Sequence, residues 1–152
     1  FTEPNTSRHV QLYKHYDSNP QRVVPALQQL RTILIATDCV RGPTYAAAQF
    51  ITIEQVQTLL KTGSIPIHSD DVAWMTSLSQ PRALLGLGVI DSTDTVPPSV
   101  EYAYRIQVPP LGGTEEWALE VSTRLDLNAP TPPNDLYDQI TWDRSGPLRF
   151  LD

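Results

Sequence analysis

The sequence contains a single cysteine, and this scarcity removes disulfides from the fold. Cys39 is the only cysteine among 152 residues, so no intramolecular disulfide can form. It follows an apolar stretch, a position typical of a small buried side chain. A catalytic thiol would need a base nearby, and the sequence around Cys39 offers none. We therefore expect the fold to depend on hydrophobic packing and hydrogen bonds.

Charged residues are also scarce, at 18% of the chain, whereas hydrophobic residues make up 40%. The formal net charge of −6 argues against non-specific binding of nucleic acid, because phosphates require clustered Lys and Arg. No apolar run reaches the roughly 18–20 residues that span a bilayer, so we expect no membrane association. The start of the sequence has no basic stretch followed by an apolar segment, and we expect a cytoplasmic protein.

Common enzyme signatures are missing as well. The chain has no phosphate-binding loop, no nucleophile elbow, no helical zinc-protease motif and no Cys-x-x-Cys pair. Gly86 and Gly88 lie in an apolar run that lacks the third glycine and the helix of a dinucleotide-binding turn. We therefore expect no cofactor, and the sequence leans away from an enzymatic function.

Apolar residues in the first half of the chain recur mainly at helical spacing. Residues 9–16 are the exception, because they alternate between apolar and polar and predict one short strand. Asn19 and Pro20 then form a helix start, and apolar residues follow at three- and four-residue intervals. Pro25 is unfavourable there, because its ring clashes with a carbonyl one turn earlier unless the helix bends or starts later.

Three further helices are predicted before position 80. Residues 44–50 are rich in alanine and favour a helix. Thr52 and Gln55 match a capping box, which predicts that a separate helix begins at Thr52 and ends at Gly63. A short helix is expected within residues 69–78, where polar residues that can cap a helix precede apolar ones.

After about position 80 the apolar spacing changes to two residues, which is typical of strands. Residues 83–90 form a continuous apolar run and predict a buried strand. Residues 100–108 and 116–122 alternate, and the glycines between them predict that the two strands form a hairpin. The segment 137–142 adds a predicted edge strand.

The expected fold class is therefore α+β. The N-terminal strand and the helices should pack on a mainly antiparallel sheet that the C-terminal half of the chain largely forms. We expect a single domain over residues 1–152, with residues 1–7 as a loose N-terminal arm.

One stretch of the chain resembles a known signature. Residues 12–20, LYKHYDSNP, resemble the strand–turn–helix signature Y-(R/K)-H-x-D-G-Y-P of small bacterial and phage proteins. Later features agree in order, with an alanine-rich helix at 46–50 and a closing hairpin between 102 and 121. Ser18 and Asn19 stand where the signature has glycine and tyrosine. The resemblance implies the fold described above and an origin in a phage or mobile element, and it implies no activity.

The first candidate site lies at the end of the first predicted strand. A histidine can act as acid or base near neutral pH, and His15 and Asp17 would face the same side of an extended strand. This pair is the candidate for catalysis in a small hydrolase-type enzyme. The simpler alternative, which the sequence favours, is an Asx turn at Asp17 beside a polar strand-end residue.

Two acidic clusters also have simpler explanations than a site. His68 with Asp70 and Asp71 could bind a metal, but helix capping accounts for these acidic residues, so we expect no metal site. The second cluster is Glu115, Glu116 and Glu120. Glu116 and Glu120 alternate with the apolar residues of a predicted strand, which favours a solvated face over paired catalytic carboxylates. Arg105, on the neighbouring predicted strand, is a candidate cross-strand partner for them.

The leading functional hypothesis is a non-enzymatic interaction or structural module that binds another protein or a second copy of itself. Aromatic residues are enriched at the centres of interfaces. The predicted binding residues are Lys14, Trp74 and Trp142. Further aromatic candidates, which the alternation places in the core, are Tyr102, Tyr104 and Trp117. A hydrolase-type enzyme that uses His15 and Asp17 stays as the alternative.

Overall fold

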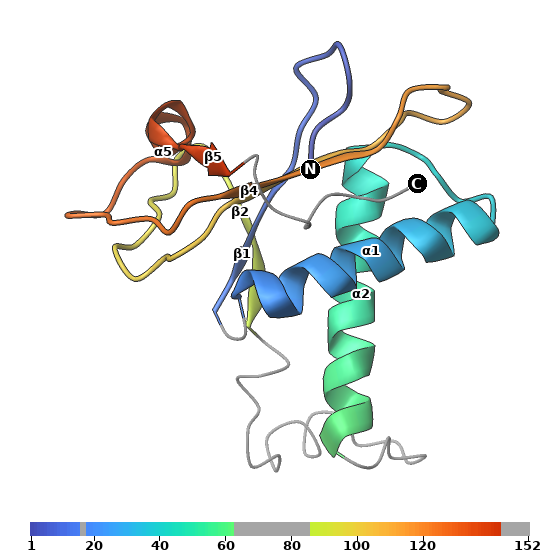
Figure 1. The fold of residues 1–152 in the computed structure, drawn as a ribbon, viewed down its shortest axis with the longest axis horizontal. Helices are drawn as coiled ribbons and strands as arrows, with labels where there is room; N and C mark the ends of the chain where they lie inside the picture. The colour runs from blue at the N-terminus through green and yellow to red at the C-terminus, as the bar shows by residue number, and fades with distance from the viewer. Residues whose placement is uncertain (16–17, 63–85, 144–152) are drawn as a thin grey trace.

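The computed structural model describes residues 1–15, 18–62 and 86–143 (Figure 1). Within these residues the chain forms three helices and two antiparallel sheets, so the predicted α+β fold class is confirmed. The helices are α1 (Pro20–Ala36), α2 (Pro43–Thr62) and α5 (Pro133–Gln139). The strands are β1 (Gln11–Lys14), β2 (Leu87–Ile90), β3 (Tyr104–Gln107), β4 (Ala118–Ser122) and β5 (Trp142–Asp143).

Helix α1 begins as the sequence predicts. The side-chain oxygen of Asn19 accepts a hydrogen bond from the main-chain nitrogen of Arg22 at 3.2 Å, and Pro20 occupies the first turn. The helix continues through Pro25, whose ring lies on the exposed face and displaces no core side chain. The buried face consists of small and branched apolar residues: Val23, Val24, Ala26, Leu27, Leu30 and Leu34.

Helix α2 is one continuous helix, so the prediction of separate helices over 44–50 and from Thr52 is wrong. The hydroxyl of Thr52 donates to the carbonyl of Ala48 at 3.2 Å, one turn earlier, instead of capping a new helix. Gly42, with φ of 86°, turns the chain into α2 in a conformation that glycine adopts readily. The predicted helix end at Gly63 and the helix predicted within 69–78 lie outside the described residues.

Strands β3 and β4 confirm the predicted hairpin, although each is shorter than the alternation suggested. Tyr104 lies opposite Val121 in an antiparallel register. Arg105 lies opposite Glu120, and the two side chains form the predicted cross-strand ion pair. Strand β5 pairs with β4 through Trp142, which completes a sheet of three strands in the order β3-β4-β5.

Two strand predictions need correction. The predicted buried strand over 83–90 is described from Gly86 onward, and β2 is only half-buried, with 65% of Val89 exposed. β2 pairs with β1 in a sheet of two strands, and Gly88 and Val89 remain exposed to solvent. The predicted edge strand over 137–142 is also wrong in part, because its first three residues belong to α5 and only Trp142 enters β5.

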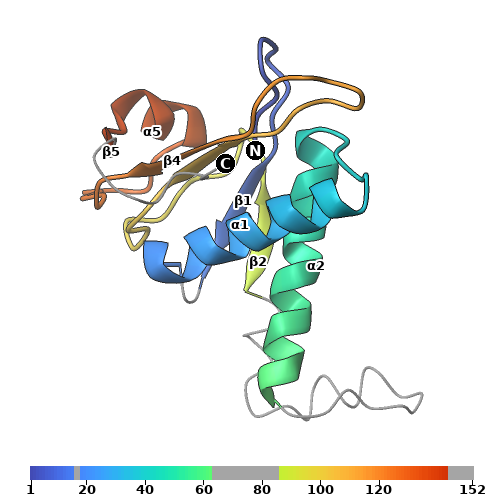
Figure 2. The same cartoon turned by 45° about the vertical axis from the view of Figure 1, so that its right-hand side comes forward.

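The main core lies where α1 and α2 pack together and cover the inner face of the β3–β4 hairpin (Figure 2). Helix α5 lies at the opposite end of the described chain from α2 (Figures 1 and 2). The buried apolar cluster joins the two helices to both strands of the hairpin: Val23, Val24, Ala26, Leu27, Leu30, Leu34, Ala46, Phe50, Ile106, Val108, Leu119 and Val121.

The N-terminal residues connect the two sheets. The main-chain nitrogen of Thr2 donates to the carbonyl of Ile106 at 2.7 Å, and the nitrogen of Val108 donates to the carbonyl of Thr2 at 2.9 Å. On the other side, Phe1 and Val10 exchange main-chain hydrogen bonds of 3.0 and 2.9 Å. The first three residues therefore lie as a strand-like segment between the start of β1 and the end of β3, and we call them the bridging segment (Phe1–Glu3).

Side chains also hold the bridging segment in place. The ring of Phe1 packs against the ring of Phe50 in α2, with centroids 5.9 Å apart. Glu3 is only 8% exposed and pairs with Arg8 at 3.1 Å. The prediction of a loose arm over residues 1–7 is therefore wrong for the first three residues, because contacts far along the chain order them.

Candidate functional site

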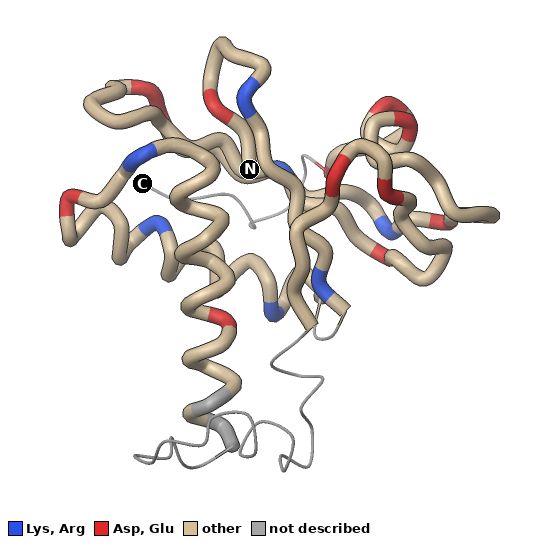
Figure 3. The backbone as a smooth tube through the Cα atoms, turned by 180° about the vertical axis from the view of Figure 1, so that it is seen from behind, with Lys and Arg blue, Asp and Glu red and all other residues tan. Residues whose placement is uncertain are grey.

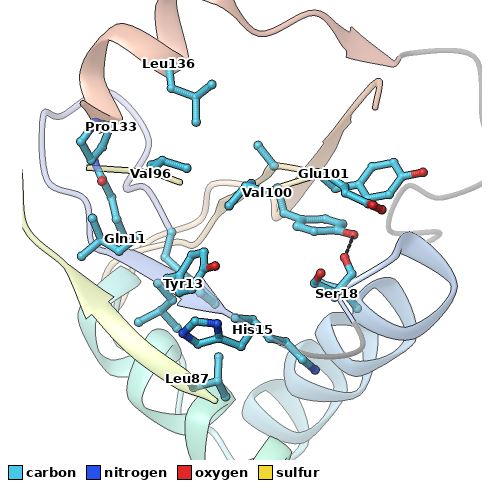
Figure 4. A pocket seen from close by; sticks show the side chains of 18 of the residues that line it. Gln11, Tyr13, His15, Ser18, Leu87, Val96, Val100, Glu101, Pro133 and Leu136 are labelled. Atoms are coloured by element: carbon cyan, nitrogen blue, oxygen red, sulfur yellow. Dashed lines mark hydrogen bonds between the residues drawn. The ribbon is translucent and has the colours of Figure 1, made fainter. Parts of the chain in front are cut away.

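A partly enclosed cavity of about 240 Å³ lies between β1 and the segment that leads into β3 (Figure 4). Two continuous runs of the chain line it, Gln11–His15 and Ser99–Tyr104. Apolar side chains from α1 and α2 line it on one side, and apolar side chains from α5 and the loop at Val96 line it on the other. The cavity therefore passes between the two sheets, and its lining includes Val23, Leu27, Phe50, Leu87, Leu136 and Tyr137.

The bridging segment explains why this space exists. Within the described residues, β1 is an edge of the two-stranded sheet and β3 is an edge of the three-stranded sheet. Thr2 pairs with His9 on one side and with Gln107 on the other. It therefore holds the two edges two strand spacings apart, roughly 9–10 Å. Further along β1, the cavity lies between residues 11–15 and 99–104, and no described strand lies between them.

Four tyrosines are among the polar side chains that line the cavity: Tyr13, Tyr102, Tyr104 and Tyr137. The hydroxyl of Tyr104 donates to the carbonyl of Ser18 at 2.5 Å, the bond drawn as a dashed line in Figure 4. Burial raises the pKa of Tyr104 well above its ordinary value, and the neighbouring Tyr102 adds a smaller upward effect. Tyr104 therefore stays protonated and remains a donor across the physiological range. Burial also raises the pKa of Tyr137, against an opposing effect of Arg105.

Of the predicted catalytic pair, the structure describes only His15. It lines the cavity, and its ring packs edge-on against the ring of Tyr13 with centroids 4.5 Å apart (Figure 4). Its main-chain nitrogen donates to the carbonyl of Gly86 at 2.8 Å, which extends the pairing of β1 with β2. Asp17 lies outside the described residues, so the predicted approach of the two side chains stays a prediction.

Lys14, a predicted binding residue, lies in the cavity wall with its charge already paired. Its ammonium group forms an ion pair with Glu54 of α2, and the two side chains are 18% and 13% exposed. This contact ties β1 to α2. Lys14 therefore has a structural role that the sequence alone did not indicate.

The predicted aromatic binding residues separate in the structure. Trp74 lies outside the described residues. Trp142 lies in β5, with the guanidinium of Arg105 4.6 Å from the centre of its ring, and it does not line the cavity. Trp117 is partly buried against the main core. Tyr102 and Tyr104 do line the cavity, although the alternation placed both in the core.

Sequence reasoning missed Tyr13, Val100 and Leu136 as cavity residues. Each is an ordinary apolar or aromatic residue in its own element, so no local pattern distinguishes it. They come together because β1 and the segment before β3 lie on two sides of a space that no described strand fills, and α5 adds Leu136 at one side. That arrangement depends on contacts between residues far apart in the sequence.

No protein-family model matches the chain, and comparison with curated proteins and with solved structures finds no similar sequence or fold. The resemblance to small bacterial and phage proteins therefore stays a prediction.

Three further properties of the described residues concern metal ligands, membrane-spanning helices and the distribution of charge. Among these residues, no group of three or more His, Cys, Asp and Glu side chains could hold a metal ion. No helix in the same ranges combines the length and apolar character needed to cross a bilayer. Lys and Arg lie on several separate elements, interspersed with Asp and Glu (Figure 3). The cavity is therefore the feature from which a function can be argued.

Proposed function

We propose that the protein is a non-enzymatic interaction module that binds an apolar segment of another protein in the cavity between β1 and β3. The observation that carries this proposal is the cavity itself, with a volume of about 240 Å³ and a largely apolar and aromatic lining. An apolar cavity of about 150 Å³ stays dry and can bind benzene. This cavity is larger and partly open, and its apolar lining offers an apolar side chain a surface to bury against. We also propose that the protein originates from a phage or mobile element, and the only support for this is the resemblance of residues 12–20 to the signature of small bacterial and phage proteins.

The composition of the walls favours a protein partner. Two of the tyrosines that the sequence nominated for an interface, Tyr102 and Tyr104, lie in the wall. Tyr is enriched at interface centres, since its ring buries a large area with few rotatable bonds. Among the described residues, the opposite wall is β1, an edge of the two-stranded sheet, and strand edges are common docking places for peptides.

A selection experiment tests this function without knowledge of the partner. Random peptides displayed on phage are selected on the immobilised protein, and enriched peptides are synthesised and titrated. Val100→Trp should fill the cavity, because Val100 lines it and is half-buried. We expect enriched peptides to contain apolar residues and to bind this variant at least about tenfold more weakly, a loss of about 1.4 kcal/mol.

Val89→Trp is the matched control, because it makes the same substitution at a residue that is 65% exposed and does not line the cavity. It should bind the selected peptides as the unmodified protein does. The proposal fails if no peptide is enriched, or if the two variants bind the enriched peptides equally well.

A hydrolase-type enzyme is the second proposal, carried by the position of His15 in the cavity wall. This mechanism requires the carboxylate of Asp17 to orient the imidazole of His15. Hydrolysis of p-nitrophenyl acetate tests it, with His15→Ala as the variant and His9→Ala as the control at another exposed histidine. A loss of about 10²-fold in the first variant alone is expected of a general base. Equal rates in both variants would remove the hypothesis.

A further inference from the structure

Strand β2 is the outermost described strand on the β1 side of the molecule (Figures 1 and 2). The spatial order among the described residues is β2, β1, the bridging segment, β3, β4 and β5. No described strand pairs with the edge of β2 that faces away from β1. Val89 is 65% exposed and Gly88 is exposed as well, so β2 is accessible to solvent there. An accessible strand edge presents main-chain groups that can pair with another strand.

The hydrogen bonds to β1 show which main-chain groups of β2 point outward. The nitrogen of His15 donates to the carbonyl of Gly86 at 2.8 Å, so Gly86 faces β1. Main-chain groups alternate in direction along a strand. Gly88 therefore also faces β1, whereas the N–H and C=O groups of Leu87 and Val89 point away from it. No hydrogen bond joins these outward groups to another described residue.

The edge of β2 also lacks the features with which proteins block strand pairing, which include charged side chains, proline and short length. Residues 87–90 contain no charged residue and no proline. At the other end of the strand order, β5 has two residues, and one of them is Asp143. The two outer edges therefore differ, because β5 is short and charged whereas β2 is apolar and uncharged.

The outward groups of β2 are self-complementary under two-fold symmetry. Leu87 and Val89 lie on either side of Gly88, so an antiparallel second copy with Gly88 on the symmetry axis places each Leu87 opposite a Val89. Opposed residues of this kind exchange two main-chain hydrogen bonds, and every outward group of both copies is then used. An axis at Val89 is less favourable, because the next outward residue, Asp91, already bonds to Asp94 through its N–H and C=O.

The same pairing covers an apolar side chain that a single copy leaves exposed. Leu87 and Val89 are two residues apart and point to one face of the strand. On that face Leu87 packs against the main core, but Val89 remains 65% exposed. Directly opposed residues of an antiparallel pair share a face. In the pairing about Gly88, Val89 of each copy therefore packs beside Leu87 of the other.

We propose that the chain forms a weak, two-fold symmetric dimer in which two copies of β2 pair antiparallel about Gly88, giving a sheet with the order β1-β2-β2-β1. The inference goes beyond the proposed function, because it uses the edge of β2 that faces away from β1 instead of the cavity. One pair of short strands buries far less than the roughly 1,200–2,000 Å² of a stable interface. We therefore expect a dissociation constant of about 0.1–1 mM, and a monomer at micromolar concentrations.

Sedimentation equilibrium tests the dimer, over concentrations from about tenfold below to about tenfold above that dissociation constant. The weight-average mass should rise toward twice that of the monomer. Val89→Lys should raise the dissociation constant at least about tenfold, because a charged side chain on a strand edge opposes pairing. Leu111→Lys is the matched control, because it makes the same change of charge at a residue that is 75% exposed in the loop between β3 and β4. It should associate as the unmodified protein does.

Two results of this experiment would overturn the proposal. A chain that stays monomeric over the whole range excludes a second copy as the occupant of this edge, whether or not a strand of another protein binds there. A dimer that Val89→Lys and Leu111→Lys weaken equally, or that neither weakens, would have its interface elsewhere.

Amide hydrogen exchange distinguishes strand pairing from other contacts at the same edge. The amides of Leu87 and Val89 should exchange at least about threefold more slowly when the dimer is the main species. Those of Gly88 and Ile90 should change little, because they already face β1. Equal slowing at all four residues, or at none of them, would refute the pairing.

Cysteine cross-linking in a glutathione redox buffer tests the register. In the proposed dimer Gly88 lies opposite itself in the close type of antiparallel pair, with Cα atoms about 4.5 Å apart, which a disulfide can span. A Cβ atom at Gly88 meets no atom within 4 Å. With Cys39 replaced by alanine, Gly88→Cys should therefore form the covalent dimer at least about tenfold faster than Val89→Cys, whose Cα atoms would lie about 8 Å apart. Equal rates, or a faster reaction of Val89→Cys, would refute the register.

Discussion

The two sheets of this protein are built from similar antiparallel pairs but are buried to different extents. In the β3–β4 hairpin, Ile106, Leu119 and Val121 are 5% exposed or less. In the β1–β2 pair no residue is buried, and Val89 is 65% exposed. Strand pairing is the same in both, so the difference comes from what covers each sheet. The hairpin is stabilised by the helical core. β1 is instead held by main-chain hydrogen bonds of Val10 and His15 at its two ends and by the ion pair of Lys14 with Glu54.

The largest expected effect is the difference in the free energy of unfolding between matched Val→Ala truncations in the two sheets. Val121→Ala removes two methyl groups from the core and should lower the free energy of unfolding by about 2 kcal/mol. Val89→Ala in β2 should change it by less than about 0.5 kcal/mol, because the side chain is mostly in water. Urea denaturation of both variants measures the contrast. Equal losses would show that β1–β2 is as well packed as the hairpin.

The ion pair of Lys14 with Glu54 should matter more than an exposed one. Lys14→Met leaves the largely buried carboxylate of Glu54 without its partner and should cost about 1–2 kcal/mol. Arg124→Met is the control, since its ion pair with Glu101 is 69% and 52% exposed and should be worth about 0–0.5 kcal/mol. If both losses are equally small in thermal denaturation, the ion pair does not anchor β1 to α2.

The hydrogen bond from Tyr104 to Ser18 joins the β3 side of the cavity to the start of α1. Tyr104→Phe should cost about 1 kcal/mol at neutral pH. The folded-state pKa of Tyr104 is raised, so its stabilising effect is complete below the unfolded pKa of about 10 and is lost as pH rises further. Urea denaturation above about pH 10 should therefore bring the two proteins closer in stability. Parallel pH profiles would contradict this role.

The smallest expected effect is a gain of stability from Gly88→Val. Gly88 lies exposed in β2, and a Cβ atom there would meet no atom within 4 Å. Valine favours strands, so the variant should be more stable by about 0.5 kcal/mol. Gly42→Ala is the opposing control, because its φ of 86° is strained for alanine and should cost about 1 kcal/mol. Thermal denaturation that shows a loss for Gly88→Val would mean that β2 needs the glycine.

Local signals predicted several elements well. Asn19 and Pro20 specified the start of α1 because a cap acts through its own first turn. The alternation of residues 100–108 and 116–122 predicted the hairpin, since neighbouring strands in sequence usually pair. The capping box at Thr52 failed because its hydroxyl had another acceptor in Ala48 and the helix simply continued.

The candidate site was predictable only in part. His15 and Lys14 were nominated from the sequence and do line the cavity, and Tyr102 and Tyr104 were nominated but assigned to the core. Alternation shows which side chains share a face of a strand. It does not show whether the next position in the sheet is filled, so it could not distinguish a tyrosine in the core from one beside a cavity.

The sequence by itself determined the α+β class, the start of α1 and the hairpin, because these follow from contacts within a turn or between neighbouring strands. Only the tertiary structure decided that the first residues lie between two sheets and that a cavity continues from them. Thr2 sets that spacing through main-chain hydrogen bonds with Ile106 and Val108, and Ile106 lies 104 positions away in the sequence. Empty space and burial are properties of the neighbours that folding brings together, and no local pattern encodes them.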